Sequence, residues 1–126
     1  MSVARLAEGR KVLVVEDQMV VVLIIEEALV GLGADIVGPV AHVTAALELA
    51  RDAPLDAAVL DVNIRDGNTC AVADVLAKRA IPFVFCSGYS DWALEERHRG
   101  RPRLSKPYTP EALQEGLIQL LSAPGG

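Results

Sequence analysis

The sequence predicts an α/β fold built around a parallel sheet that is buried on both faces. Short apolar runs that each end in a reactive residue alternate with segments of helix length, which is typical of repeated strand–helix units. The chain has 126 residues and is 52% hydrophobic, enough for one domain with a substantial core. We therefore expect a doubly wound, five-stranded sheet in a single domain over residues 1–126, with its core between about residues 10 and 122.

The predicted elements follow one another along the chain, and several are bounded by capping residues. Gly33 follows the first helical segment as a C-terminal cap, while Thr109 and Pro110 supply the N-cap and first position of the last helix. The segment 18–32 is rich in β-branched residues, but it is too long for a strand and contains no turn, so we interpret it as a helix. Strands are predicted near 11–16, 34–39, 56–61, 81–86 and 102–105, and helices near 18–32, 43–52, 68–79, 90–98 and 109–122.

Composition and charge argue against several classes of protein. A formal net charge of −5 makes nucleic acid an improbable partner. The longest apolar stretch, Met19–Ile25, is too short to span a membrane, and residues 1–10 lack the features of a signal peptide, so we expect a cytoplasmic protein. Cys70 and Cys86 lack metal-ligand spacing and are predicted to be buried, reduced thiols.

Reactive side chains lie where the predicted strands end. Glu16 and Asp17 follow the first strand, Asp61 ends the third, and the last two strands lead to Ser87 and Lys106. Because the carboxyl ends of parallel strands emerge at one edge of an open sheet, these residues should meet in one shallow pocket. Three crowded carboxylates cannot all stay ionised without a nearby cation, so the pattern predicts a divalent metal site.

These motifs resemble those of response-regulator receiver domains of two-component signalling, over essentially the whole chain. The resemblance rests on Glu16-Asp17, Asp61, Ser87-Gly88 and Lys106-Pro107, which are specific together although each is weak alone. The segments 60–63 and 82–89 are similar to those of short, single-domain alphaproteobacterial receivers. The resemblance implies a flavodoxin-like (β/α)5 fold with strand order 2-1-3-4-5.

The resemblance also implies a phosphoacceptor response regulator rather than an enzyme acting on other substrates. Asp61 would take a phosphoryl group from a histidine kinase or histidine phosphotransfer protein and later lose it by self-catalysed hydrolysis. Lys106 would hold a phosphoryl oxygen as a point charge, and the Ser87 hydroxyl would hydrogen-bond to the new phosphoryl group. Output would pass to an unknown downstream protein, by contact or by phosphorelay.

A magnesium ion is the cofactor that the resemblance implies. Asp17 and Asp61 would ligate Mg²⁺ directly, together with the backbone carbonyl of Asn63. Glu16 would act mostly through water. Magnesium prefers six oxygen ligands and keeps several waters, so this small set of protein ligands is sufficient.

Three departures from the family pattern leave the output mode open. Arg103 stands three residues before Lys106, where many receivers carry an aromatic residue, so the usual aromatic switch cannot operate there. Tyr89 is a possible replacement near the pocket. The loop 62–67 lacks the common proline, and the short segment 87–106 predicts a stunted fourth helix.

Two alternative functions compete with this interpretation. Taken singly, Asp17 could merely start a helix and Asp61 could be a turn residue. One alternative function is a receiver-fold interaction module that works independently of phosphorylation, and the intact acidic pair, Asp61 and Lys106 argue against it. A small-molecule phosphatase or nucleotide-binding enzyme is disfavoured. The first strand is not followed by a glycine-rich turn, and no aspartate stands two residues beyond Asp61.

The first helix carries apolar residues on two sides. A helical wheel predicts that one stripe faces the sheet, and this stripe comprises Val21, Ile24, Ile25, Ala28 and Leu32. A second group is predicted to face outward, and it comprises Met19, Val22, Leu23 and Val30. Either the last helix covers part of this second group, or it forms a protein contact such as a homodimer.

Overall fold

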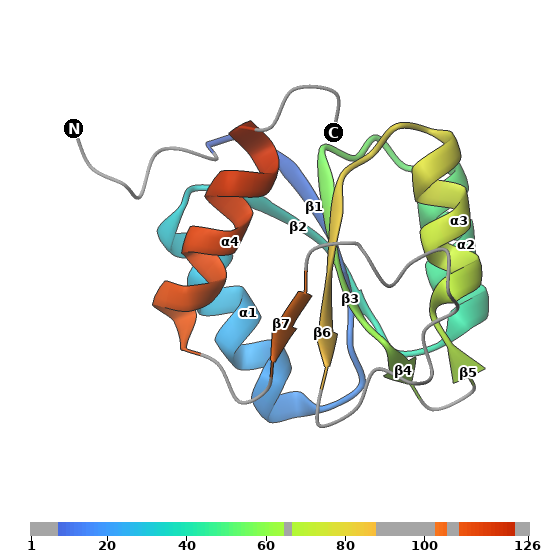
Figure 1. The fold of residues 1–126 in the computed structure, drawn as a ribbon, viewed down its shortest axis with the longest axis horizontal. Coiled ribbons are helices and arrows are strands. Elements are labelled where there is room, and N and C mark those ends of the chain that lie inside the picture. The colour runs from blue at the N-terminus through green and yellow to red at the C-terminus, as the bar shows by residue number, and fades with distance from the viewer. Residues whose placement is uncertain (1–7, 65–66, 88–102, 106–108, 123–126) are drawn as a thin grey trace.

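The computed structural model describes residues 8–64, 67–87, 103–105 and 109–122, which form a sheet covered by helices on both faces (Figure 1). The five strands of the sheet are β1 (Lys11–Val15), β2 (Asp35–Val40), β3 (Ala57–Asp61), β6 (Phe83–Ser87) and β7 (Arg103–Ser105). All neighbouring pairs are parallel, and the order is β2-β1-β3-β6-β7. Counted along the chain, this is the predicted order 2-1-3-4-5, so the fold prediction is confirmed.

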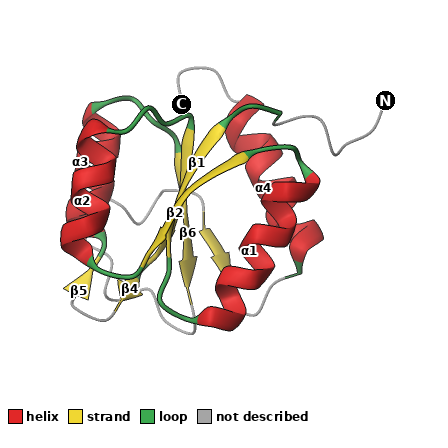
Figure 2. Ribbon diagram, turned by 180° about the vertical axis from the view of Figure 1, so that it is seen from behind, coloured by secondary structure: helices red, strands yellow, loops and turns green. Residues whose placement is uncertain are grey.

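In the described part of the chain, helices cover both faces of the sheet (Figure 2). One pair consists of α1 (Met19–Gly31) and α4 (Pro110–Ser122), and the other of α2 (Val43–Asp52) and α3 (Cys70–Lys78). No helix among the described residues is long and apolar enough to cross a membrane. The helix predicted near 90–98 lies outside the described residues.

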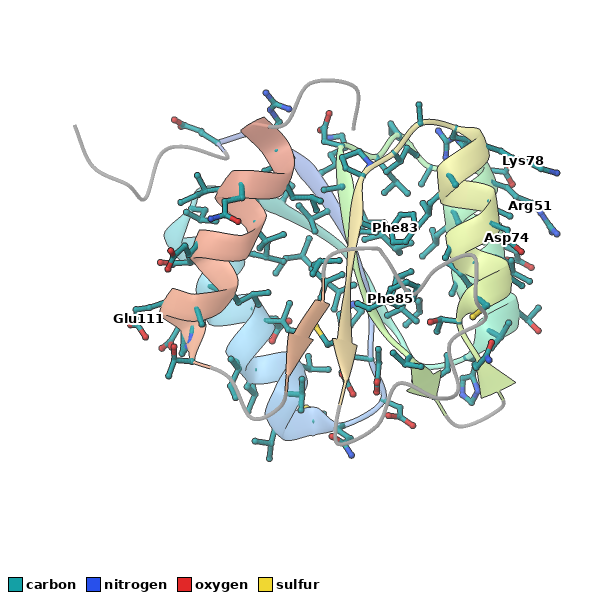
Figure 3. All side chains as sticks on the ribbon, in the orientation of Figure 1. Arg51, Asp74, Lys78, Phe83, Phe85 and Glu111 are labelled. Atoms are coloured by element: carbon teal, nitrogen blue, oxygen red, sulfur yellow. The ribbon has the colours of Figure 1, made fainter. Side chains whose placement is uncertain are left out.

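Residues of the central strands alternate between two cores. Leu13 and Leu60 point into the core under α2 and α3, whereas Val14 and Val59 belong to the core under α1 and α4. Burial on both sides explains why these strands are apolar without alternation. Phe83 and Phe85 also face α2 and α3 (Figure 3), and their rings pack edge to face with centroids 5.5 Å apart.

The predicted caps and thiols agree with the structure. Gly33 follows the end of α1 with a φ of +77°, a conformation that glycine adopts without strain. The Thr109 hydroxyl accepts a hydrogen bond of 3.1 Å from the backbone N–H of Ala112, as an N-cap does. Cys70 and Cys86 are both free thiols and both buried.

A short antiparallel pair after β3 was not predicted. β4 (Asn63–Ile64) and β5 (Gly67–Asn68) occupy a segment expected to be a loop, and α3 begins at Cys70 rather than near residue 68. Strands of two residues are too short to show any alternation of polar and apolar residues, so the pattern could not reveal them. The pair folds the chain back toward the end of β3.

One predicted face of α1 is corrected by the structure. Val22 was expected to face outward, but it is only 7% exposed, and Leu29 is also buried. Leu29 belongs to the core that α1 shares with α4 and the sheet, so the buried surface of α1 is wider than the one predicted stripe. The Gln114 side-chain amide of α4 donates a hydrogen bond of 3.1 Å to the backbone carbonyl of Ala28. The outward positions of Met19, Leu23 and Val30 are confirmed, and Val20 joins them.

Candidate functional site

The carboxyl ends of β1 and β3 lie side by side and bring three acidic residues together. Val15 at the end of β1 is in register with Leu60, one residue before Asp61. The chain then continues past β1 into Glu16 and Asp17. One carboxylate oxygen from each of these three acidic residues lies within 4.8 Å of the others. We call Glu16, Asp17 and Asp61 the acidic cluster.

Glu16 is the buried and structurally fixed member of the acidic cluster. Its backbone N–H donates to the carbonyl of Val40, which extends the pairing of β1 with β2 by one residue. Its Oε1 accepts hydrogen bonds from the backbone N–H groups of Asp17, at 3.1 Å, and Gln18, at 3.0 Å. Glu16 is 2% exposed and thus orders the turn into α1, whose N-cap residue Gln18 makes no side-chain cap of its own. Asp17 is more open to solvent.

Asp61 is held rigidly by the sheet on which it ends. It is 7% exposed and in register with Cys86 of β6, and the next residue, Val62, donates its N–H to the Cys86 carbonyl. Pairing with β1 and β6 on either side fixes the backbone of β3 up to this point. The backbone that carries the Asp61 carboxylate is therefore fixed at the carboxyl edge of the sheet.

The acidic cluster has the donor chemistry of a site for a hard divalent cation. Unit charges within 4.8 Å repel by roughly 3 kcal/mol per pair at an effective dielectric constant of about 20, so a cation here is strongly attracted. Magnesium binds oxygens at about 2.1 Å in an octahedron, which places neighbouring ligand oxygens about 3 Å apart. The donor set of the acidic cluster, three carboxylates with oxygens within 4.8 Å of one another, fits a hard divalent cation such as Mg²⁺.

The other predicted site residues are placed by the backbone alone or lie outside the described residues. Ser87 ends β6, adjacent to β3, and Asn63 begins β4, two residues after Asp61. Arg103 begins β7 and is in register with Phe85. Lys106 and Tyr89 lie outside the described part of the chain.

The sequence analysis did not single out Thr69, which makes a buried hydrogen bond to the backbone of Asp61. Its Oγ1 donates to the Asp61 carbonyl at 2.7 Å. A threonine just before a helical pattern predicts an N-cap, and nothing in the sequence distinguishes a cap from a hydroxyl turned toward a distant strand.

Comparisons with known proteins identify the family. No family model matches the chain, and no match was found among curated proteins. Among solved structures, SdrG from Sphingomonas melonis Fr1 is 41% identical, with a TM-score of 0.79 over 90% of this chain and 97% of that chain. SdrG from Pseudomonas melonis Fr1 in its BeF3-activated conformation is 39% identical, with a TM-score of 0.72 over 95% of this chain and 98% of that chain.

Two further structures are described as receivers. A response regulator receiver protein from Sinorhizobium medicae WSM419 is 26% identical, with a TM-score of 0.80 over 92% of this chain and 97% of that chain. The receiver domain of sensor histidine kinase PA1611 from Pseudomonas aeruginosa PAO1, described with magnesium coordinated in its active-site cleft, shares the fold at 23% identity, with a TM-score of 0.75 over 91% of this chain and 99% of that chain. The identity of the chain to these relatives, its strand order and the acidic cluster at the carboxyl edge of the sheet all agree with one family. The chain therefore belongs to the response regulator receiver domains.

Proposed function

We propose that this chain is a phosphoacceptor response regulator in which Asp61 takes a phosphoryl group in a Mg²⁺-dependent reaction. The observation that carries the proposal is the acidic cluster, in which the buried end of β3 presents Asp61 beside two further carboxylates. A carboxylate attacks a negatively charged phosphoryl group only where that charge is neutralised. A cluster that attracts a divalent cation next to a rigidly held carboxylate supplies this condition.

In this proposal Asp17 and Asp61 ligate Mg²⁺ directly, and the backbone carbonyl of Asn63 completes the protein ligands. Glu16 acts mostly through water, because its Oε1 is already engaged by two backbone N–H groups. When bound, the ion offsets the charge of the carboxylates and of the incoming phosphoryl oxygens. The magnesium described for the PA1611 receiver is consistent with this assignment.

Lys106 and Ser87 complete the proposed chemistry. Ser87 ends the strand next to β3, and its backbone is in register with Ser105, the residue before Lys106. Ser87 is thus the last residue of β6, and Lys106 follows β7 in the sequence; both strands end at the same edge of the sheet as β3. We assign Lys106 to a phosphoryl oxygen and the Ser87 hydroxyl to the phosphorylated state.

The donor is proposed to be a histidine kinase or histidine phosphotransfer protein, and the output a protein contact or a phosphorelay. The chain is not proposed to act as an enzyme on other substrates, and its cytoplasmic location stays a prediction. Tyr89 as a replacement for the aromatic switch residue and Arg103 as a changed switch position also stay predictions. The receiver family supports the signalling role, and the identity of each partner is our proposal.

The exposed apolar residues of α1 are proposed to be a protein-contact surface. They are Met19, Val20, Leu23 and Val30, each more than half exposed, and we call them the α1 surface. The α1 surface begins two residues after Asp17, beside the acidic cluster. A protein that delivers a phosphoryl group to Asp61 must lie against this part of the molecule, so we assign the surface to the donor. A homodimer through the same residues is the alternative.

The experiment that tests the function compares the two aspartates near the ends of β3. Asp61→Asn should abolish phosphoryl uptake from acetyl phosphate, because an amide cannot form an acyl phosphate. Asp56→Asn is the matched control, since Asp56 precedes β3 and its carboxylate accepts from the backbone N–H of Lys11 at the opposite edge. Intact-mass spectrometry with hydroxylamine treatment reads the outcome.

A hydroxylamine-sensitive phosphate that persists at the wild-type rate in Asp61→Asn would contradict the site assignment. A wild-type protein that neither takes phosphate from acetyl phosphate nor binds beryllofluoride would instead support the phosphorylation-independent module.

A further inference from the structure

One buried residue, Thr69, hydrogen-bonds to the backbone at the start of the segment between Asp61 and α3. Thr69 is fully buried, and its Oγ1 donates a hydrogen bond of 2.7 Å to the carbonyl of Asp61. Its backbone N–H donates to the carbonyl of Val62 at 2.9 Å. Two successive peptide groups after β3 are therefore fixed by the same residue.

The Thr69 hydroxyl is directed away from the role its position suggests. Thr69 is the N-cap residue of α3, yet its side chain makes no capping hydrogen bond. The helix start is supported instead by Asn68, whose Oδ1 accepts from the backbone N–H of Cys70 at 3.0 Å. A buried carbonyl at the end of a strand needs a donor, and the Thr69 hydroxyl supplies it to Asp61.

The short strand pair extends this restraint to the next residue. Asn63 of β4 is in antiparallel register with Asn68 of β5, the neighbour of Thr69. Three hydrogen bonds from Thr69 to the carbonyls of Asp61 and Val62, together with the β4–β5 pair, therefore hold the two ends of the segment from Asp61 to Thr69 together. The restrained residues include both proposed magnesium ligands of this segment. Asp61 would contribute its carboxylate, and Asn63 its backbone carbonyl.

From these contacts we infer that Thr69 is a positioning residue for the metal and phosphoryl site. This inference rests on the proposed function of Asp61. The hydroxyl sets the peptide that follows Asp61, and the Thr69 N–H sets the peptide that precedes Asn63. Together they fix the separation of two ligand groups that Mg²⁺ requires in near-octahedral geometry. Loss of the hydroxyl removes its hydrogen bond to the Asp61 carbonyl and loosens that separation.

The test separates the hydroxyl from the bulk of the side chain. Thr69→Val keeps the shape and removes the donor, whereas Thr69→Ser keeps the donor and removes a methyl group. We expect Thr69→Val to weaken Mg²⁺ binding at least fivefold by calorimetric titration and to slow phosphoryl uptake from acetyl phosphate about tenfold. We expect Thr69→Ser to remain within about twofold of wild type in both measurements.

A matched control removes buried volume from the same helix without touching the acidic cluster. Val72 is fully buried in α3, and Val72→Ala should lower stability in urea while leaving Mg²⁺ affinity unchanged. Should Thr69→Val fail to fold, Thr69→Ala replaces it in the comparison with Thr69→Ser. A merely structural role would lower stability in all these variants and move Mg²⁺ affinity in none.

Two results would overturn the inference. One is a folded Thr69→Val, or Thr69→Ala in its place, that binds Mg²⁺ and takes phosphate as wild type does. The other is Thr69→Ser losing as much affinity as Thr69→Val. The metal titration also keeps this inference distinct from the proposed function. If the wild-type protein binds Mg²⁺ but does not accept phosphate, only the proposed function is contradicted. The Mg²⁺ affinities of the Thr69 variants would still test the inference.

Discussion

Two members of the acidic cluster differ in burial: Glu16 is buried, and Asp17 is partly exposed. The Glu16 carboxylate accepts hydrogen bonds from backbone N–H groups at the start of α1, whereas the neighbouring Asp17 is partly exposed. Residues with such different surroundings should respond differently to substitution. Loss of the Asp17 charge should affect the metal much more than the fold.

We predict that Asp17→Asn weakens Mg²⁺ binding by about tenfold or more, which corresponds to about 1.4 kcal/mol. In the absence of metal the variant should be at least as stable as wild type, because one of three mutually repelling carboxylates is removed. Thermal unfolding with and without Mg²⁺ measures both effects, since a ligand that binds only the folded state raises the melting temperature.

The control for Asp17→Asn is Asp52→Asn, which removes the same charge at the exposed C-terminal end of α2. That end is remote from the carboxyl edge of the sheet, because α2 begins where β2 ends. An undiminished thermal shift by Mg²⁺ in Asp17→Asn would show that Asp17 is not a ligand.

At the residue level, site residues at strand ends could be predicted from the sequence, whereas a residue that acts through a long-range backbone contact could not. Glu16, Asp17 and Asp61 could be predicted to meet, because each follows an apolar run that had to be a strand of one parallel sheet. Thr69 could not be found in this way. Its contact with Asp61 depends on how the β4–β5 pair folds, and two-residue strands leave no periodic pattern.

At the level of elements, the contact between α1 and α4 depends on a glycine. A Cβ added at Gly31 would lie 2.5 Å from Nε2 of Gln114, the atom that donates to the carbonyl of Ala28. Gln114 must then move and give up this hydrogen bond. The Ala28 carbonyl keeps a second donor, the backbone N–H of Leu32, so the loss is modest.

A double-mutant cycle tests this contact. In a Gln114→Ala background, Gly31→Ala should stabilise the fold by about 1 kcal/mol, the usual gain of alanine over glycine in a helix. In the wild-type background the gain should be smaller by about 0.5 to 1.5 kcal/mol, the value of the displaced hydrogen bond. Urea unfolding gives the four free energies, and equal gains in both backgrounds would contradict the steric coupling.

At the level of elements, the apolar pattern predicted the strands of the sheet better than it predicted which sides of α1 are buried. The central strands were assigned correctly because their continuous apolar runs match burial on both faces. The outward assignment of Val22 was wrong, since Val22 is 7% exposed, and a wheel that assigns one buried stripe also leaves out the buried Leu29. The sheet and α4 together bury a wider part of α1 than a single stripe.

At the scale of the whole molecule, the two layers of helices differ in how apolar their outer surfaces are. On α2 the exposed residues include Thr44, Glu48, Arg51 and Asp52, which suit a solvated face. On α1 the exposed residues include the four apolar members of the α1 surface. Exposed apolar residues that gather on one surface often mark a protein contact, so the α1 side of the molecule is the expected side for protein contact.

We predict that Leu23→Lys with Val30→Lys slows phosphoryl transfer from a protein donor about tenfold or more, since two charged residues would be placed within the apolar contact. Uptake from acetyl phosphate should stay unchanged, because neither side chain belongs to the acidic cluster. Thr44→Lys with Gln119→Lys adds the same charge at exposed positions of α2 and α4 and should leave both rates unaltered. Both substituted residues of α1 are more than half exposed, so the fold should tolerate lysine there.

Light scattering of the same proteins decides between the donor and a second copy of the chain. A monomeric wild type, together with a donor-specific loss of rate, assigns the α1 surface to the donor. A wild-type dimer that the Leu23/Val30 variant converts to monomer assigns it to self-association instead. Unchanged transfer rates and unchanged mass would contradict a contact role for this surface, because an apolar interface cannot absorb two buried ammonium groups without a measurable loss of affinity.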